Sequence, residues 1–143
     1  MVLNQGGETM SQAYERAKMI QERNTFALHN AIELESADEN CVVMRLEIND
    51  KSKNPLGIVH GGAMYTMADC AAGIVINTDG RRHVTQGSSM HYLKNRTEGV
   101  IRAAGRVVHR GKTTSLVHVE ITDEGGVLLA SGEFTFFCLD ANK

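Results

Sequence analysis

Residues 54–69 read NPLGIVHGGAMYTMAD, and this stretch decides how the chain must fold. It contains the only proline, Pro55, and a Gly-Gly pair directly after His60. From Gly62 to Ile76 the residues are apolar nearly all round when they are placed at about 100° per residue, which is typical of a buried helix. Asp69 is the one carboxylate in that helix. A buried carboxylate costs several kcal/mol unless it is paired, hydrogen-bonded or protonated, so its presence needs a reason.

Length and composition are typical of one ordinary globular domain. The chain has 143 residues, of which 42% are hydrophobic and 22% are charged, and its formal net charge is −2. This length is enough to bury a core, and the basic footprint of a nucleic-acid-binding protein is missing. The longest apolar run, around Ile58–Ile76, carries His60 and Asp69 and is therefore a poor membrane span. We expect no membrane association and no targeting segment.

The three cysteines, Cys41, Cys70 and Cys138, are far apart, and each lies in an apolar segment. Metal sites usually contain closely spaced pairs of ligands, and that pattern is absent from the sequence. We therefore expect buried, reduced thiols in a cytoplasmic protein, with no metal and no cofactor.

The rest of the chain predicts an α+β domain. Residues 11–29 are rich in helix formers, and residues 1–10 are expected to be a poorly ordered tail. Strands with alternating apolar residues are expected at Ala31–Glu35, Cys41–Ile48, His83–Leu93, Val100–Val108, Thr113–Thr122 and Val127–Cys138. The last four strands are expected to be antiparallel in sequence order. A single domain over residues 11–143 follows, with a long sheet curled around the apolar helix.

The polar groups of that helix lie on one narrow strip. On a helical wheel Asp69 lies beside Tyr65 and Thr66, one turn earlier. Gly73 lies one turn later, and the strip leads back to the Gly-Gly start of the helix. N–H groups in a first helical turn point outward at the positive end of the helix dipole, where they can hold a developing oxyanion. A tightly packed turn is the alternative interpretation of the glycine pair, and a structural network is the alternative for the aspartate.

Two polar residues precede the helix. His60 has the chemistry of a base, although a histidine in this position more commonly caps or packs. Asn54 is held in an extended conformation by Pro55, so its side chain either caps the following turn or orients a ligand.

The whole string resembles the hotdog-fold thioesterases of the PaaI-like branch. Their motif runs Asn-x-x-Gly-x-x-His-Gly-Gly and is followed by an apolar helix that bears an acid. The matching positions are Asn54, Gly57, His60, Gly61, Gly62 and Asp69. The resemblance spans about Phe26 to Cys138 and includes the segment HRGKTT at residues 109–114. It implies a hotdog fold, in which a long antiparallel sheet wraps around a central helix beside an N-terminal helix.

The resemblance also implies roles for five residues in thioester hydrolysis. Asp69 would be the nucleophile or general base towards the thioester carbonyl, and the backbone N–H of Gly61 would polarise that carbonyl. Asn54 would orient the reacting water or the thioester, while His60 would be structural or orienting. Thr85 matches a Ser/Thr position that hydrogen-bonds the water or the carboxylate across the subunit interface.

The substrate that the resemblance implies is an acyl-CoA, so that coenzyme A is part of the substrate. Arg110, Gly111 and Lys112 are the first candidates to bind its phosphates, and Arg81 and Arg82 are the next. Solvated turn charges are the alternative interpretation of all of them. Active sites in the family form between two subunits, so we expect a homodimer with shared sites, paired into a homotetramer.

Two departures from the family concern local structure. Asn30-Ala31 stands where many relatives carry a glycine. The polar stretch Gln86–Ser89 predicts either a bulge in the strand or an unusually wet acyl pocket. Two other functions also remain open. A hotdog-fold enoyl hydratase or dehydratase would use His60 with Asp69, and a non-catalytic module would only bind acyl-CoA. The acid nine residues after the histidine favours the thioesterase, while the acyl group and the choice between CoA and carrier-protein pantetheine stay open.

Overall fold

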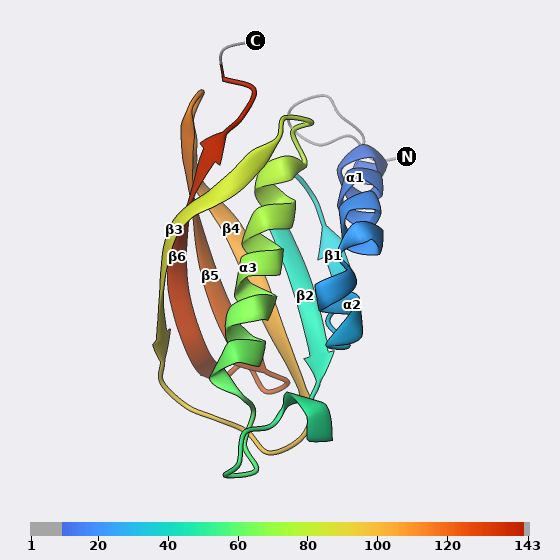
Figure 1. The fold of residues 1–143 in the computed structure, drawn as a ribbon, viewed down its shortest axis with the longest axis vertical. Coiled ribbons are helices and arrows are strands. Elements are labelled where there is room, and N and C mark those ends of the chain that lie inside the picture. The colour runs from blue at the N-terminus through green and yellow to red at the C-terminus, as the bar shows by residue number, and fades with distance from the viewer. Residues whose placement is uncertain (1–9, 142–143) are drawn as a thin grey trace.

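The computed structural model describes residues 10–141. Six antiparallel strands form one sheet that curls around a single long helix (Figure 1). The elements are α1 (Met10–Arg23), α2 (Thr25–His29), β1 (Glu33–Ala37), β2 (Cys41–Glu47), the 3-10 helix η1 (Asp50–Ser52), α3 (Gly61–Asn77), β3 (His83–Tyr92), β4 (Val100–Arg110), β5 (Thr114–Asp123) and β6 (Leu128–Cys138). Except for Met10, the tail expected at residues 1–10 lies outside the described residues.

The N-terminal helix is broken at Asn24, which corrects the expectation of one helix over residues 11–29. The Asn24 side chain accepts a hydrogen bond from the Ala27 N–H at 3.1 Å and so caps the start of α2. Asparagine competes with helix continuation in this way because its side chain offers the backbone another partner. Ala13 and Ala17, one turn apart in α1, are both fully buried.

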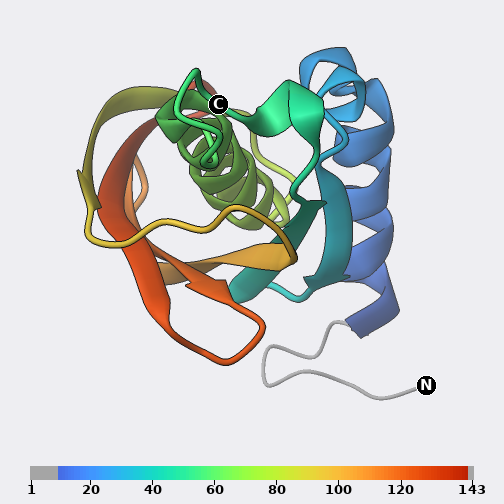
Figure 2. The same cartoon turned by 90° about the horizontal axis from the view of Figure 1, so that it is seen from below.

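The strand order is β1-β2-β4-β5-β6-β3, which corrects the expectation that the last four strands pair in sequence order. β4, β5 and β6 form a meander, but β3 lies at the far edge of the sheet and pairs with β6. The reason is α3, which crosses the inner face of the sheet between β2 and β3. Figure 2 looks along this helix and shows β3 on one flank, with β1, α1 and α2 on the other.

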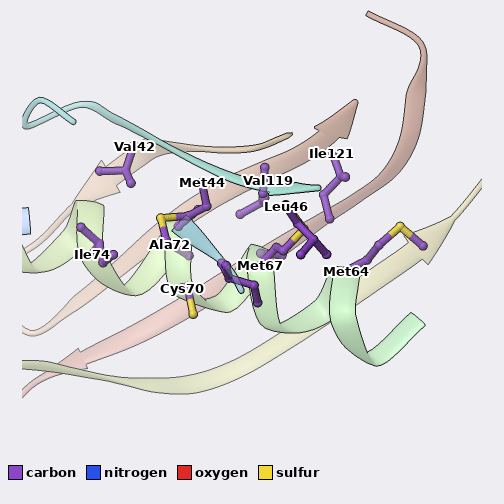
Figure 3. Close-up of a cluster of buried hydrophobic side chains, with 14 of the residues drawn as sticks. Val42, Met44, Leu46, Met64, Met67, Cys70, Ala72, Ile74, Val119 and Ile121 are labelled. Atoms are coloured by element: carbon purple, nitrogen blue, oxygen red, sulfur yellow. The ribbon is translucent and has the colours of Figure 1, made fainter. Parts of the chain in front are cut away.

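α3 is the centre of the hydrophobic core. Its buried residues are Met64, Met67, Ala68, Cys70, Ala71, Ala72, Ile74, Val75 and Ile76. They pack against inward side chains of β2 and β5, among them Met44 and Val119 (Figure 3). Gly105 on β4 allows the helix to approach closely, because a Cβ there would lie 3.0 Å from the backbone carbon of Ala71. The buried apolar helix that the sequence predicted is therefore confirmed.

Two local irregularities correspond to the departures from the family pattern. Ala31 has a φ of 59°, in the left-handed region where glycine carries no steric penalty. The pairing of β3 with β6 shifts register between Thr85 and Gly87, so the bulge predicted in this polar stretch is confirmed.

The sheet, the enclosed apolar helix and the flanking N-terminal helices together form a hotdog fold, as the resemblance implied. No helix within residues 10–141 combines the length and the apolar character that a membrane crossing requires.

Candidate active site

One face of α3 is left uncovered by the sheet. From Met67 to the end of the helix, every residue is buried except Asp69, Gly73 and Asn77. Together with Thr66, these residues recur at intervals of three or four and therefore share one stripe of the helix. We call Thr66, Asp69, Gly73 and Asn77 the open stripe.

A pocket of about 450 Å³ opens on this stripe around Asp69. Its walls come from the α1–α2 junction, from α3 and from β3. The lining residues are Asn24, Phe26, Tyr65, Thr66, Asp69, Cys70, Thr85 and Ser88. Hydroxyl groups are prominent among them, so the pocket suits a carboxylate that works with a water molecule.

Asp69 and Thr85 are hydrogen-bonded to each other in this pocket. The Thr85 hydroxyl donates to Oδ1 of Asp69 at 3.0 Å. This bond forms within one chain, which corrects the expectation that Thr85 acts across a subunit interface. Oδ2 of Asp69 accepts no hydrogen bond from any residue in the described range 10–141, so one carboxylate oxygen remains available to a reacting water.

Cys70 lies beside Asp69 but is not a nucleophile. Burial, and then the charge of Asp69, raise the pKa of its thiol to about 11, although the Asn24 amide works in the opposite direction. That amide lies 3.4 Å from the sulfur. Because the thiolate is the reactive form of cysteine, a thiol with this pKa is unreactive at neutral pH.

Two tyrosines connect α3 to β3 along the pocket. The Tyr65 hydroxyl is hydrogen-bonded to Ser88, and its ring packs edge-on against Phe134 with the ring centroids 5.8 Å apart. The Tyr92 hydroxyl donates to the carbonyl oxygen of Gly61 at 3.1 Å. These contacts fix the strand that carries Thr85 against the helix that carries Asp69.

Three lining residues were missed by the sequence reasoning, namely Asn24, Phe26 and Ser88. Asn24 lies inside a run of helix formers, where an asparagine is a weak sign of a break. Ser88 belongs to the polar stretch that predicted the bulge. Neither signal relates these positions to Asp69, because only the folded chain brings the helix break and the edge strand to the same face of α3.

The start of α3 leaves one backbone donor open. His60 is the N-cap, and its Nδ1 accepts a hydrogen bond from the Gly62 N–H at 2.7 Å. Nδ1 therefore carries no hydrogen, because it accepts this bond. Among the described residues no acceptor is found for the Gly61 N–H. The geometry thus makes His60 a structural cap and Gly61 the available donor.

Asn54 is engaged in its own loop. Its Oδ1 accepts hydrogen bonds from the Leu56 N–H at 2.9 Å and from the Ile58 N–H at 3.4 Å. It does not line the pocket around Asp69. The structure therefore places Asn54 as a turn-capping residue and does not bring it to Asp69 within one chain.

Gly61 and Asp69 are too far apart to act on one carbonyl group from a single chain. They are eight residues apart on the same helix, which corresponds to about 12 Å along its axis. The Gly61 N–H also points away from the body of the helix, as N–H groups of a first turn do. An oxyanion donor and a base must both lie within hydrogen-bond distance of the reacting groups. One chain therefore does not bring Gly61 and Asp69 to the same carbonyl group.

Arg110 lies at the opposite end of α3 and caps it. Its guanidinium donates to the carbonyl oxygens of Ile76 at 2.8 Å, Glu39 at 2.8 Å and Val75 at 3.2 Å. It also forms an ion pair with Asp79 at 3.1 Å. These contacts stabilise the C-terminal end of the helix, so the expectation that Arg110 binds phosphate is not supported.

The other candidate phosphate ligands lie next to this cap. Gly111 and Lys112 accept hydrogen bonds from Arg81 through their carbonyl oxygens, at 3.1 Å and 3.0 Å. Arg82 pairs with Asp140 at 2.8 Å. All of them lie beyond the C-terminal end of α3, away from the helix start at Gly61.

The model of the thioesterase superfamily matches residues 56–130, which include α3 and the Asp69–Thr85 pair. The chain belongs to the thioesterase superfamily. This thioesterase is 30% identical over 110 residues to the 1,4-dihydroxy-2-naphthoyl-CoA hydrolase of Listeria monocytogenes, a match that covers 73% of this chain and 87% of the relative.

Two solved structures resemble this thioesterase in fold. A hypothetical thioesterase of Streptococcus pneumoniae, solved with coenzyme A, superposes with a TM-score of 0.77 and 30% identity, over 83% of this chain and 95% of that chain. The PaaI protein of Escherichia coli superposes with a TM-score of 0.87 and 23% identity, over 91% of this chain and 95% of that chain. At 23% identity, the likeness to the PaaI protein shows a shared fold alone.

The S. pneumoniae thioesterase has also been solved with an aspartate changed to alanine and with a threonine changed to alanine. Those two positions are 16 residues apart. Asp69 and Thr85 have the same separation of 16 residues.

Proposed function

We propose that this thioesterase hydrolyses acyl-CoA thioesters to the free acid and coenzyme A, with Asp69 as the general base. The observation that carries the proposal is the Asp69–Thr85 pair, because the threonine orients the carboxylate and leaves its second oxygen for water. The CoA thioester in the name of the Listeria relative and the coenzyme A in the S. pneumoniae structure support this substrate class.

The chemistry needs only a base and an oxyanion donor. Asp69 removes a proton from water while the water oxygen bonds to the thioester carbon. The carbon–sulfur bond then breaks, and the thiolate leaves and receives the proton, so the products are an acid and a thiol. Because thiolate is a good leaving group, no strong acid is required. General base catalysis contributes about 10²–10⁴-fold in rate, and one oxyanion donor contributes about 2.7–4 kcal/mol.

We also propose a homodimer in which Asp69 of one chain works with the Gly61 N–H of a second copy. The separation of the two groups on α3 supports this arrangement, because one chain does not bring both groups to one carbonyl. β3 supports it as well, since it is a ten-residue edge strand whose residues Val84–Ser89 are all exposed. An exposed edge strand of this length tends to pair with another chain.

Two further proposals concern the assembly and its location. Pairing of dimers into a homotetramer rests on the resemblance to PaaI-like enzymes and is measured by light scattering after gel filtration. A cytoplasmic location rests on Cys41, Cys70 and Cys138, which are all free thiols in the structure.

The assignment of Asp69 is tested by Asp69→Asn, which keeps the shape of the side chain and removes the base. We expect kcat for acyl-CoA hydrolysis, measured by thiol release, to fall by about 10²–10⁴-fold. Hydrolysis in ¹⁸O-labelled water under single turnover separates the two carboxylate roles. A general base leaves Asp69 unlabelled, whereas a nucleophile exchanges its oxygen. Full activity of Asp69→Asn would show that the base is another group.

Gly61→Pro tests the oxyanion donor because it removes only the N–H. Proline is favoured at the first position of a helix, and His60 before it is already extended, with φ −68° and ψ 134°. We expect kcat to fall by about 10²–10³-fold while the melting temperature stays close to that of the wild type. An unchanged kcat would remove Gly61 from the mechanism.

Mixing the two inactive variants tests the shared site. A mixed dimer of Asp69→Asn with Gly61→Pro contains one site with both functional groups, so random mixing restores about a quarter of wild-type activity. The matched control is a chain that carries both substitutions. When it is mixed with either single variant, no site contains both functional groups, so activity stays at the background of that variant. A mixture that stays inactive contradicts the two-chain site. Acyl-CoA binding without any thiol release would favour a binding module instead.

A further inference from the structure

A second cavity, of about 280 Å³, lies at the start of α3. Its walls come from α2, η1 and the first turns of α3, and Figure 2 shows η1 between α3 and α2. Among the described residues 10–141, one lysine lines it and no acidic residue does. The lining residues include Phe26, Lys51, His60, Gly62, Ala63 and Thr66. We call this space the lysine cavity.

The lysine cavity and the Asp69 pocket share a wall. Phe26 and Thr66 line both of them. Phe26 is 64% exposed on α2, and the Thr66 hydroxyl is already hydrogen-bonded to the carbonyl oxygen of Gly62 at 2.8 Å. Thr66 belongs to the open stripe, which the sheet does not cover. A ligand that is too long for the Asp69 pocket therefore finds room in the lysine cavity.

The lysine cavity has a positive electrostatic potential. Lys51 lies on η1 and is exposed, and no ion pair is found for it within residues 10–141. Asp50, the acid next to it in the sequence, does not line the cavity. The positive end of the α3 dipole adds to the charge of Lys51, because Gly62 and Ala63 belong to the first turn of that helix. An anionic group is therefore stabilised here.

The cavity combines this charge with apolar surface. The ring of Phe26 and the methyl group of Ala63 contribute carbon atoms to its walls. A Cβ at Gly62 would lie 2.9 Å from Nδ1 of His60, so a side chain has no room at that position. A hydrocarbon chain that ends in one anionic group suits this combination. A nucleotide does not suit it, because a single lysine does not balance several phosphate charges.

The distance along α3 sets the length of the ligand. Asp69 and Ala63 are six residues apart on the helix, which corresponds to about 9 Å. An extended chain advances about 3.5 Å for every three bonds, so about eight carbon atoms span this distance. The flexible stem of Lys51 can follow the terminal group over a small range of chain lengths.

We propose that the lysine cavity binds the far end of the acyl group, and that the preferred substrates are CoA thioesters of about eight acyl carbons that end in a carboxylate. This inference rests on the proposed function and names its acyl class. The thioester lies at Asp69, the hydrocarbon passes Thr66 and Phe26, and the terminal carboxylate binds Lys51. The bond changes at the thioester are those already described, so the products are a dicarboxylic acid and coenzyme A.

Two uncleavable analogues test the cavity without catalysis. They are CoA thioethers that carry an ω-carboxyheptyl or an octyl group and differ only at the far end. Each is titrated calorimetrically into the wild type and Lys51→Met. We expect the dissociation constant of the carboxyheptyl analogue to rise by about tenfold in Lys51→Met, and that of the octyl analogue to stay the same. Lys51→Arg keeps the charge and the affinity. Lys94→Met, at an exposed lysine that does not line the cavity, is the matched control.

An equal rise for both analogues would overturn the proposal, because Lys51 would then bind the CoA portion. Unchanged binding of both would overturn it as well. Since the thioethers are not cleaved, the titration gives its result even if the protein hydrolyses no thioester. Cleavage of octanoyl-CoA without any effect of Lys51→Met on the carboxyheptyl analogue would keep the proposed function and reject the lysine cavity.

Kinetics test the preference for a terminal carboxylate. Suberoyl-CoA carries the eight-carbon diacid, and octanoyl-CoA is its neutral counterpart. We expect the ratio of kcat/KM for suberoyl-CoA to that for octanoyl-CoA to fall by about tenfold in Lys51→Met. Added salt should lower the same ratio in the wild type but not in Lys51→Met, because salt screens an exposed charge. A ratio that Lys51→Met leaves unchanged would contradict the proposal.

Thr66→Leu tests the path between the two spaces by narrowing it. We expect kcat/KM for suberoyl-CoA to fall by about tenfold. Butyryl-CoA should keep its wild-type value, because its chain ends before Thr66. Thr66→Ser, which keeps the hydroxyl and adds no bulk, is the control and should behave as the wild type does. An equal fall for both chain lengths would show that the acyl group takes another path.

Discussion

Asp69 is explained by its position on α3. It lies on the open stripe, where the sheet does not cover the helix, and it keeps an accessible carboxylate oxygen beside one held by Thr85. The desolvation cost that a core aspartate would carry is therefore avoided. Its neighbour Cys70 is buried against Asn24 at the wall of the same pocket, and its raised pKa makes it an unreactive thiol. Adjacent residues of α3 therefore differ in role, since Asp69 is available for reaction and Cys70 contributes to packing.

Thr85→Ala removes the hydrogen bond that orients Asp69. Because a hydrogen bond to a charged group contributes about 1.5–3 kcal/mol, we expect kcat for acyl-CoA hydrolysis to fall by about 10- to 100-fold. Thr85 is exposed, so the melting temperature should change little. Thr85→Ser, which keeps the hydroxyl, is the control and retains most activity. If both variants were equally active, the hydroxyl would have no part in the reaction.

α3 is capped by side chains at both ends, which explains two residues of the family motif. His60 caps the start and leaves the Gly61 N–H available, while Arg110 binds carbonyl oxygens at the end. The two caps fix the ends of the helix that carries the open stripe and the Asp69 pocket. Residues that resemble substrate ligands in the sequence thus position the element that carries the site.

Arg110→Met tests the capping function. Loss of the hydrogen bonds to Val75, Ile76 and Glu39 and of the ion pair with Asp79 should lower the free energy of unfolding by about 2–3 kcal/mol, measured by urea denaturation. KM for acyl-CoA should stay near the wild-type value. Lys112→Met, an exposed neighbour, is the control and should change stability by less than about 0.5 kcal/mol. A higher KM with unchanged stability would restore Arg110 as a phosphate ligand.

The stability of the whole molecule depends on pH through a buried histidine next to this cap. The side chain of His83 is fully buried, with Nε2 3.3 Å from Asp79. Burial lowers the pKa of His83 below its usual value, and the charges of Arg81 and Arg110 act in the same direction, against that of Asp79. The folded state therefore disfavours the protonated ring.

The sign of the pH effect follows from proton binding. Below about pH 6.5 the unfolded chain protonates His83 and the folded chain resists it, so stability falls as the pH drops through that value. Asp79 acts at lower pH. Although burial raises its pKa, hydrogen bonds from Arg81 lower it overall, so its contribution is lost below about pH 4.

Urea denaturation at pH 7.5 and at pH 5.5 measures the histidine effect. We expect the wild type to lose more stability between these values than His83→Gln, because the glutamine does not titrate. His29→Gln, at an exposed histidine, is the control and should follow the wild type. Equal losses in the wild type and in His83→Gln would assign the pH dependence to other groups.

Much of the fold could be predicted because it follows from local patterns. Three features depend only on neighbouring residues. They are the apolar circumference of residues 62–76, the alternation in the strands and the polar stretch Gln86–Ser89. The break at Asn24 and the position of β3 could not be predicted in this way. In sequence, an asparagine that caps a helix looks much like an exposed asparagine within one. The pairing of β3 with β6 depends on the position at which the chain returns to the sheet after α3.

By itself, the sequence determined that this protein has a buried helix with one polar strip, a glycine pair at its start and a family motif around Asp69. These are local properties, set by helical periodicity and by residue chemistry. Only the tertiary structure decided that Thr85 holds Asp69 within one chain and that Arg110 caps the helix. Those arrangements join residues far apart in the chain, and packing of the sheet around α3 determines which of them meet.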